Sequence, residues 1–524
     1  MISYISAIVA GLLTHLGAQY YEPTALQAVC WGTLANTVLG LRFWLLYTQS
    51  IVPFLLLLNA IYLITLYTSI FIYRTFFHRL RAFPGPFWAR VSKLWTCEIH
   101  LRGDYHRETV RLHQKYGDIV RVAPNELDIN DVEAIKLIYG SGSKLYKGPW
   151  YDGPSATGEA RSIQGTKDHG KHRLRRKTWA QGNSGAAMIE FEPLMVQHLN
   201  VFIEQIRARK EVDIAHWYNF LSFDIMGDLT FGVPFDMVKT GQTHHFMDTI
   251  HKFMKAVSIL SAIPWLNSLA NALPTDSAVK DLEKFSRDCF QNRKAKGSSR
   301  KDLFYYLLGE DQDGTKLTEL ELIMDSRTAI VGGSDTTSIA LGCLIYYLVA
   351  HQDKYKRLQA EVLAQGEQMD NNSLGNLPYL GAVINEALRL MPPVPQGLQR
   401  VVPPEGMQLA GKFIPGNTLV SVSPWTVQRD PRNWGRPDEF IPERWLGEGP
   451  EPCIKDAWIP FSIGAYGCVG KPLAMMELRV ITATVVKNFD ISFAKGFDAA
   501  AFEASVTNDF TMTPPRVEVV LSPR

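Results

Sequence analysis

The chain has 524 residues, with 54 basic against 52 acidic side chains and a formal net charge of +2. This near-balance gives no electrostatic reason to expect a nucleic acid as a partner, because domains that bind nucleic acids concentrate positive charge. The six cysteines are scattered and form no C-x-x-C pair, which argues against a structural zinc site or a redox dithiol and favours a reducing compartment for the globular part.

The first 82 residues are predicted to form a membrane region. Residues 51–73 are 23 residues without a charge, and as a helix such a segment spans about 35 Å, which suffices to cross a bilayer. A buried core helix is the alternative for this segment. Two further uncharged runs, at 2–21 and 23–41, carry several polar residues, so either could be a span or an interfacial helix. We therefore expect one to three transmembrane helices.

Arginines directly after the third run set its expected orientation. Arg74, Arg79 and Arg81 place its C-terminal side in the cytosol by the positive-inside rule. No Lys or Arg precedes Arg42, so the basic start of a cleaved signal peptide is missing. A stiff Pro-Gly-Pro turn at 84–86 then ends any helix. The expected domains are 1–82, the membrane region, and 83–524, the cytosolic body.

The body begins with a helical pattern at 98–116 and a hairpin of short strands at 119–129. A basic run, HGKHRLRRK, follows at 169–177, and its His172 and Arg176 lie four residues apart on one helical face. Such a run is either a solvated basic face or a clamp that binds a carboxylate or a phosphate.

Residues 318–350 form the longest helical pattern of the body, with a capping box that starts at Thr318. Its last 22 residues contain one charge, that of Asp335, so a transmembrane helix must be considered. We reject it because Gly-Gly-Ser-Asp-Thr-Thr at 332–337 lies at its middle, and buried polar groups need partners or a task. The Asp335 carboxylate and the Thr336 hydroxyl could hold water and pass protons. The alternative is a kinked core helix with a self-satisfied hydroxyl.

A further helix at 379–390 places Glu386 and Arg389 three residues apart, the spacing of an ordinary helix salt bridge. After a proline-rich exit, Arg400 falls in a predicted strand, and more short strands are predicted at 407–409 and 418–422. Short strands beside many helices predict a mainly α fold with small β-sheets.

The loop at 461–470, FSIGAYGCVG, contains a candidate metal ligand, Cys468. A free thiol has a pKa of about 8.5, and a metal or a helix N-terminus lowers it. A helix is predicted to begin at Lys471, directly after the loop. Glycines at 464, 467 and 470 allow a tight turn that brings backbone N–H groups close to the sulfur. The alternative is an ordinary buried thiol.

Four motifs of the chain, and their order along it, resemble those of the cytochrome P450 superfamily of haem-thiolate monooxygenases. The resemblance extends from about residue 83 to the C-terminus. The apolar N-terminal runs are similar to those of fungal microsomal members of secondary metabolism. The matching positions are Phe461, Gly464, Cys468 and Gly470 in the cysteine loop, 332–337 in the long helix, Glu386 with Arg389, and 442–445, Pro-Glu-Arg-Trp.

The resemblance implies the P450 fold for 83–524, as a haem-thiolate catalytic domain, with haem b as cofactor and O2 as co-substrate. Cys468 would be the proximal thiolate, and Phe461 would shield it. Asp335 and Thr336 would position water and deliver protons to dioxygen. Glu386, Arg389 and Arg444 would form a structural network. His172, Arg176 and Arg400 would pair with the haem propionates.

One position departs from the family pattern. Tyr466 stands where the family usually has Arg or His. A phenol can donate a hydrogen bond to a propionate, but charge-assisted bonds are about twice as strong. We expect His172, Arg176 and Arg400 to supply the missing charge.

The resemblance further implies a membrane-bound enzyme of the endoplasmic reticulum with its catalytic domain facing the cytosol. It would insert one oxygen atom from O2 into a hydrophobic small molecule, an intermediate of secondary metabolism, with electrons from NADPH-cytochrome P450 reductase. The alternatives are a haem-thiolate isomerase or dehydratase and a non-catalytic haem-binding membrane protein. The substrate pocket is expected at 155–158, Ile330, 394–398 and 510–512.

Overall fold

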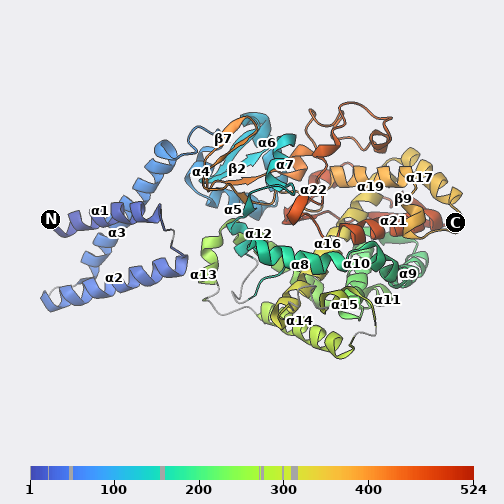
Figure 1. The fold of residues 1–524 in the computed structure, drawn as a ribbon, viewed down its shortest axis with the longest axis horizontal. Helices are drawn as coiled ribbons and strands as arrows, with labels where there is room; N and C mark the ends of the chain where they lie inside the picture. The colour runs from blue at the N-terminus through green and yellow to red at the C-terminus, as the bar shows by residue number, and fades with distance from the viewer. Residues whose placement is uncertain are drawn as a thin grey trace.

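The computed structural model describes residues 2–524 except 22, 47–50, 154–159, 271, 273–276, 298–299 and 309–316. The described part is mainly helical and holds four small β-sheets, which confirms the predicted fold class. Figure 1 shows a helical body with β2 and β7 near the end from which the N-terminal helices project, and β9 toward the opposite end.

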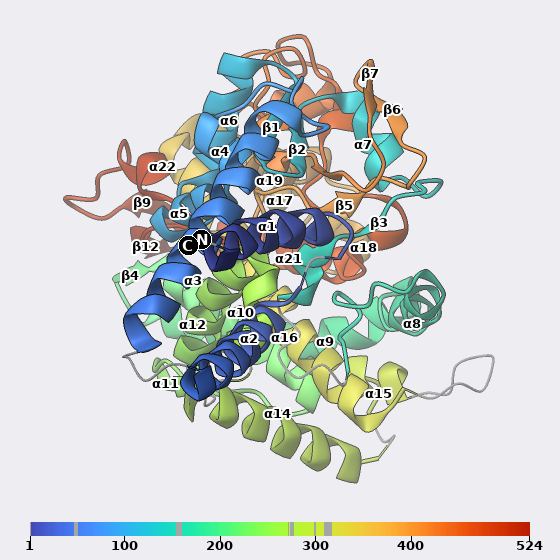
Figure 2. The ribbon, with the colours of Figure 1, turned by 90° about the vertical axis from the view of Figure 1, so that its left-hand side faces the viewer.

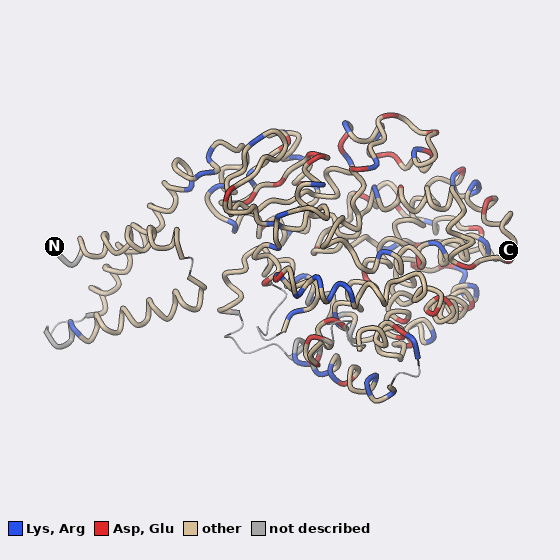
Figure 3. Tube along the Cα trace, in the orientation of Figure 1, with Lys and Arg blue, Asp and Glu red and all other residues tan. Residues whose placement is uncertain are grey.

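Three apolar helices precede the body: α1 (Ile2–Ala18), α2 (Ala25–Leu46) and α3 (Ile51–Ile72). Seen from their side, they lie in front of the body (Figure 2), and they carry almost no charged residues (Figure 3). Helix α1 packs so closely on α3 at Gly11 that a Cβ on this residue would lie 2.9 Å from the backbone oxygen of Tyr62. The continuous helix Val52–Phe77 is long and apolar enough to cross a membrane.

The largest sheet has the strand order β1-β2-β8-β5-β3. Its hairpin confirms the strands expected at 119–129, and its far edge pairs Lys147 directly with Arg400 in antiparallel register. The strands are β1 (Ile119–Ala123), β2 (Glu126–Ile129), β8 (Leu419–Ser421), β5 (Arg400–Val401) and β3 (Tyr146–Lys147). The other sheets are β4 (Glu211–Asp213), β12 (Glu518–Pro523) and β9 (Phe489–Phe493); β10 (Thr507–Asp509) and β11 (Thr511–Thr513); and β6 (Met407–Leu409) and β7 (Lys412–Ile414).

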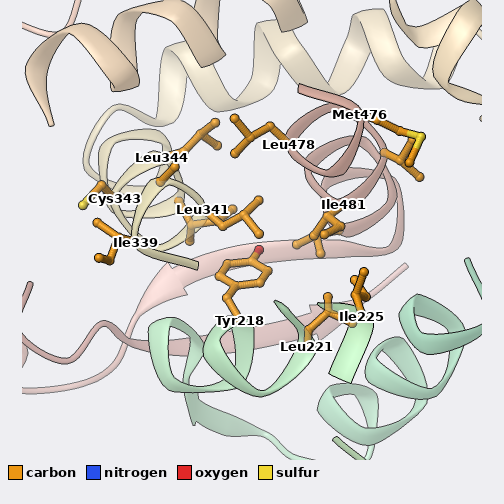
Figure 4. Packing of buried hydrophobic residues seen from close by; sticks show 14 of the residues in the cluster. Tyr218, Leu221, Ile225, Ile339, Leu341, Cys343, Leu344, Met476, Leu478 and Ile481 are labelled. Carbon is orange, nitrogen blue, oxygen red and sulfur yellow. The ribbon is translucent and has the colours of Figure 1, made fainter. Parts of the chain in front are cut away.

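The long helix α16 (Glu319–Ala350) runs through the core of the body, as expected. Thr318 caps its N-terminus in a capping box with Glu321. The helix is long and apolar enough to cross a membrane, but 72% of its apolar window is buried inside the protein, so it is a core helix. Its C-terminal half packs against α10 (Ile214–Phe231) and α21 (Lys471–Asn488). Figure 4 shows Tyr218, Leu341, Leu344, Leu478 and Ile481 meeting there.

Helix α19 (Pro378–Leu390) carries the centre of a buried ionic network. Glu386 accepts hydrogen bonds at 2.9 Å from Arg389 and from Arg444 Nε, and at 3.0 Å from the indole of Trp445. All three charged side chains of the network are buried. Both guanidinium groups also donate to backbone oxygens. A buried ionic cluster holds a fold together only when its groups are this fully bonded.

One expectation for the body is wrong. The single helix expected at 98–116 is two helices, α5 (Leu94–Arg102) and α6 (Tyr105–Tyr116). Gly103 adopts φ +69° and ends α5, a left-handed cap that glycine takes without steric cost. Further helices of the body are α4 (Phe87–Val91), α7 (Val132–Tyr139), α8 (His169–Gln181), α9 (Gly185–Arg207), α11 (Met237–Thr240), α12 (His245–Ala262), α13 (Asn267–Ala270), α14 (Ser277–Ala295), α15 (Leu303–Leu308), α17 (Gln352–Ala364), α18 (Asn371–Leu374), α20 (Pro424–Val427) and α22 (Phe502–Ser505).

Candidate active site

A cavity of about 390 Å³ lies inside the body between α16 and the cysteine loop. Cys468 and Gly470 line it on the loop side, and Gly332, Gly333 and Thr336 line it on the α16 side. The cavity therefore brings together the two motifs that the sequence assigns to metal binding and to proton delivery, although 132 residues separate Thr336 from Cys468.

The cysteine loop is closed by its own backbone. The N–H of Cys468 donates to the oxygen of Phe461 at 2.8 Å, and the N–H of Gly467 donates to the oxygen of Gly464 at 3.1 Å. Gly464 adopts φ +69°, and a Cβ there would lie 2.2 Å from the oxygen of Tyr139. This position therefore requires glycine. Helix α21 begins directly after Gly470, as predicted.

The thiol of Cys468 has accessible surface, but that surface faces the cavity. Burial raises the pKa of the thiol, and backbone N–H groups of Gly470 and Lys471 together with the charge of Arg176 act against this rise. The net shift of the pKa is upward. A bound metal cation deprotonates a coordinating thiol, which makes Cys468 a ligand suited to a metal already held in place.

Helix α8 brings His172 and Arg176 to one rim of the cavity. Arg176 Nη1 donates to the backbone oxygen of Gly467 in the cysteine loop. His172 is buried, and burial followed by the neighbouring charges of Lys147 and Arg176 lowers its pKa to about 3. Its imidazole is therefore neutral and offers a hydrogen bond without a charge. Of the two expected clamp residues, only Arg176 is a cation.

Lys147 lines the same rim, although no sequence motif singles it out. Its Nζ donates to the backbone oxygens of Ile163 and Gln164, at 3.2 and 2.7 Å. Burial, followed by the charge of Arg400, lowers the pKa of Lys147 to about 7. Arg400 itself lies fully buried behind this wall and donates to the hydroxyl of Tyr151 at 2.7 Å. Its Nε and Nη2 have no hydrogen-bond partner among the described residues.

These features fit a haem. Within the described residues there is no group of three or more His, Cys, Asp or Glu side chains that could hold a metal ion. Iron in a porphyrin needs only one such protein ligand, because the porphyrin supplies the others, and Cys468 can be that ligand. Lys147 at the rim and Arg400 behind it are buried, neither forms an ion pair with a carboxylate among the described residues, and haem carboxylates would supply such partners. Phe461 lines the cavity beside the loop.

The two proton-delivery candidates occupy different positions on α16. Thr336 lines the cavity, and its hydroxyl donates to the backbone oxygen of Gly332 at 2.6 Å. Asp335 is buried and accepts a 2.7 Å hydrogen bond from the hydroxyl of Thr511 on β11. The sequence shows no motif that links Thr511 to Asp335, because their pairing arises only when β11 folds onto α16.

A buried carboxyl group on α21, that of Glu477, also borders the cavity. Burial raises its pKa to about 8, while the nearby hydroxyl of Thr337 acts in the opposite direction. Glu477 is therefore protonated near neutral pH. No sequence signal singles out Glu477, because a single Glu on an amphipathic helix is usually exposed.

The predicted substrate pocket is partly present in the cavity wall. Ile330, Val394, Gln396, Leu398, Phe510 and Thr511 line the cavity, whereas Met512 is buried in the core behind it. The stretch 155–158 lies outside the described residues. Helices α10 and α12 add apolar residues that the sequence did not single out: Met226, Phe231, Ile250, Met254 and Val257.

Comparison with known proteins identifies the family of the chain. The family model of cytochrome P450 matches residues 82–521. The chain is 36% identical to the cytochrome P450 monooxygenase FCK2 of Fusarium pseudograminearum over 88% of this chain and 85% of the relative. It is 36% identical to the cytochrome P450 monooxygenase orf5 of Eupenicillium brefeldianum, over 87% and 94%, and 34% identical to the tryprostatin B 6-hydroxylase of Aspergillus fumigatus, over 91% and 87%. The chain therefore belongs to the cytochrome P450 family of monooxygenases.

Proposed function

We propose that this P450 monooxygenase holds haem b through Cys468 and inserts one oxygen atom from O2 into a hydrophobic intermediate of secondary metabolism. The observation that carries the proposal is one cavity that Cys468 and Thr336 both line, with the buried Lys147 and the half-buried Arg176 at one rim. Electrons would come from NADPH-cytochrome P450 reductase. The haem, when bound, supplies the activation of dioxygen.

The residues of the chain would then have distinct tasks. Cys468 holds the iron, and the loop backbone keeps its sulfur in place. Thr336 and Asp335 hold water and move protons toward the oxygen-binding side. Arg176 and Arg400 provide positive potential near the haem carboxylates, and His172 provides a neutral hydrogen-bonding partner. The apolar wall of the cavity binds the substrate and excludes bulk water.

We also propose that residues 1–82 anchor the enzyme in the endoplasmic reticulum membrane, with 83–524 as the catalytic domain in the cytosol. The apolar helix Val52–Phe77 supports this proposal, as do the arginines that follow its uncharged stretch. Protease protection of a C-terminally tagged protein in intact microsomes tests the orientation. Digestion of the tag without detergent is expected, and protection of the tag would contradict a cytosolic catalytic domain.

Two measurements test the catalytic proposal. The Soret band of the reduced carbon monoxide complex reports thiolate ligation, and Cys468→Ala is expected to abolish the thiolate signature. Purified enzyme with added reductase is then expected to consume NADPH in a substrate-dependent manner when it is offered a panel of apolar natural products. A thiolate signature without NADPH consumption with any bound substrate would favour the isomerase or dehydratase alternative.

The substrate class is proposed from the cavity wall and the relatives. One relative is named tryprostatin B 6-hydroxylase, and the apolar wall of this cavity suits a similarly hydrophobic natural product, such as a prenylated indole, a terpenoid or a polyketide. Identification of products after incubation with pathway intermediates tests this class. Oxygenation of polar substrates alone would contradict it.

A further inference from the structure

Two buried cations face each other across the edge of the main sheet. Lys147 on β3 and Arg400 on β5 are direct partners in the antiparallel register, and their side chains are 3% and 0% exposed. Like charges directly opposite each other on a sheet destabilise it. No ion pair joins either residue to a carboxylate among the described parts of the chain. The described residues therefore provide no neutralising charge for the pair, and an anionic ligand would supply one.

The side chain of Tyr466 lies against both cations. Lys147 Nζ is 4.8 Å and the guanidinium carbon of Arg400 is 4.9 Å from the centre of its ring. The electron-rich face of an aromatic ring attracts a cation at such distances. Its hydroxyl lies 3.2 Å from Nδ1 of His169, so the ring, and not the hydroxyl, faces the two charges. An arginine at this position would instead place a third cation beside them.

Of the two cations, only Lys147 lines the cavity. His172, a propionate partner expected from the sequence, is neutral because its pKa is lowered to about 3. Burial and the charge of Arg400 lower the pKa of Lys147 to about 7, so the described residues around it stabilise its positive charge poorly. A carboxylate next to Nζ would stabilise that charge.

We propose that Lys147 binds a haem propionate and supplies the positive charge that the family usually places at position 466, while the ring of Tyr466 aligns Lys147 with Arg400. This inference rests on the proposed haem b, because a porphyrin without carboxylates would give Lys147 no partner. The binding of a propionate by Lys147 would explain why a tyrosine can stand two residues before the cysteine ligand, at position 466. Lys147 and Tyr466 are positioning residues for the cofactor.

The first test is haem retention. Haem is expected to transfer from the purified holoenzyme to an excess of an apo-globin at least about tenfold faster in Lys147→Met than in the parent. This factor corresponds to the energy of one charge-assisted hydrogen bond that the variant loses. The iron reduction potential is expected to fall, because a nearby positive charge is removed. Lys167→Met is the matched control, since Lys167 pairs with Asp152 at the surface, and parent-like haem retention is expected of it.

A purely structural role for Lys147 gives a different pattern. Lys147→Met would then destabilise the haem-free protein, obtained by expression under haem limitation, as much as the holoenzyme. We expect the haem-free variant to unfold at the same temperature as the haem-free parent or higher, because the repulsion between the neighbouring buried cations Lys147 and Arg400 is gone. Haem loss within twofold of the parent, or equal destabilisation of both forms, would overturn the inference.

A second variant keeps the test decisive if Lys147→Met folds poorly. Tyr466→Arg alone is expected to destabilise the haem-free protein, because three cations then meet, and the double variant Lys147→Met/Tyr466→Arg is expected to recover both stability and haem retention. If the double variant is no more stable and retains haem no better than Tyr466→Arg, then Lys147 does not supply the charge that the family places at position 466. A parent protein without a thiolate Soret signature would refute the proposed function itself, whatever the variants show.

Discussion

The contact between Thr511 and Asp335 offers a direct test of how the candidate proton-delivery residue is held. The hydroxyl donates to the carboxylate at 2.7 Å, and both side chains are buried. Thr511→Val keeps the shape of the side chain and removes the donor. Since a hydrogen bond to a charged group contributes about 1.5–3 kcal/mol, the free energy of unfolding of the holoenzyme is expected to fall by about this amount.

The same substitution is expected to change how the enzyme uses oxygen. A carboxylate that loses this donor is held less firmly, so proton delivery through Asp335 is expected to become slower, by a factor of at most about 10–150 if the whole hydrogen-bond energy is lost. More NADPH would then end as hydrogen peroxide and less as product. The assay measures NADPH, peroxide and product in parallel for the parent, Thr511→Val and Thr511→Ser.

Thr511→Ser is the matched control, because it retains the hydroxyl, and near-parental coupling is expected of it. If Thr511→Val keeps both the stability and the product-to-NADPH ratio of the parent, then Thr511 does not hold Asp335. If stability falls while the ratio stays unchanged, the contact is structural and Asp335 does not deliver protons from this position.

Three further predictions concern the surroundings of the site. Glu386→Gln leaves the two buried guanidinium groups without their charge partner and is expected to cost about 3–5 kcal/mol; a denaturation midpoint equal to that of the parent would contradict a structural network. Gly464→Ala places a Cβ 2.2 Å from the oxygen of Tyr139 at φ +69°, so haem incorporation, read as the Soret-to-protein absorbance ratio, is expected to drop severely, whereas exposed Gly185, with open space around a Cβ, is expected to tolerate alanine. Glu477 binds its proton more tightly in the folded state, with a pKa of about 8, so its contribution to stability is present at low pH and is lost as the pH rises from about 4.5 toward 8, by up to about 1.4 kcal/mol per pH unit. Glu477→Gln is expected to remove this slope from the unfolding free energy measured across that window, and an unchanged slope would show that Glu477 is not the group responsible.

Much of the architecture follows from local sequence patterns. The capping box at Thr318 starts α16 where it is predicted, and the strands at 119–129 pair as expected, because each signal acts within a few residues of its own position. The prediction of a single helix at 98–116 was wrong, also for a local reason, because Gly103 adopts a left-handed conformation and divides the segment into two helices.

The contacts that define the chemistry could not be read in this way. Lys147 faces Arg400 because β3 and β5 pair over 253 residues of sequence separation, and Thr511 reaches Asp335 only because β11 folds against α16. Neither Lys147 nor Thr511 belongs to a motif with a fixed spacing. The neutrality of His172 is likewise a result of burial among neighbouring cations, which composition and spacing do not report.

The sequence by itself determined the family motifs, the candidate thiolate Cys468 and the apolar N-terminal segments, because residue type and short-range spacing suffice for these. Only the tertiary structure decided which buried charges share a cavity, which of them lack partners, and why a tyrosine can stand at 466. The physical reason is that the burial of a group and the charges around it depend on long-range packing. Burial and neighbouring charges together determine the protonation state of a group and whether it needs a charged partner.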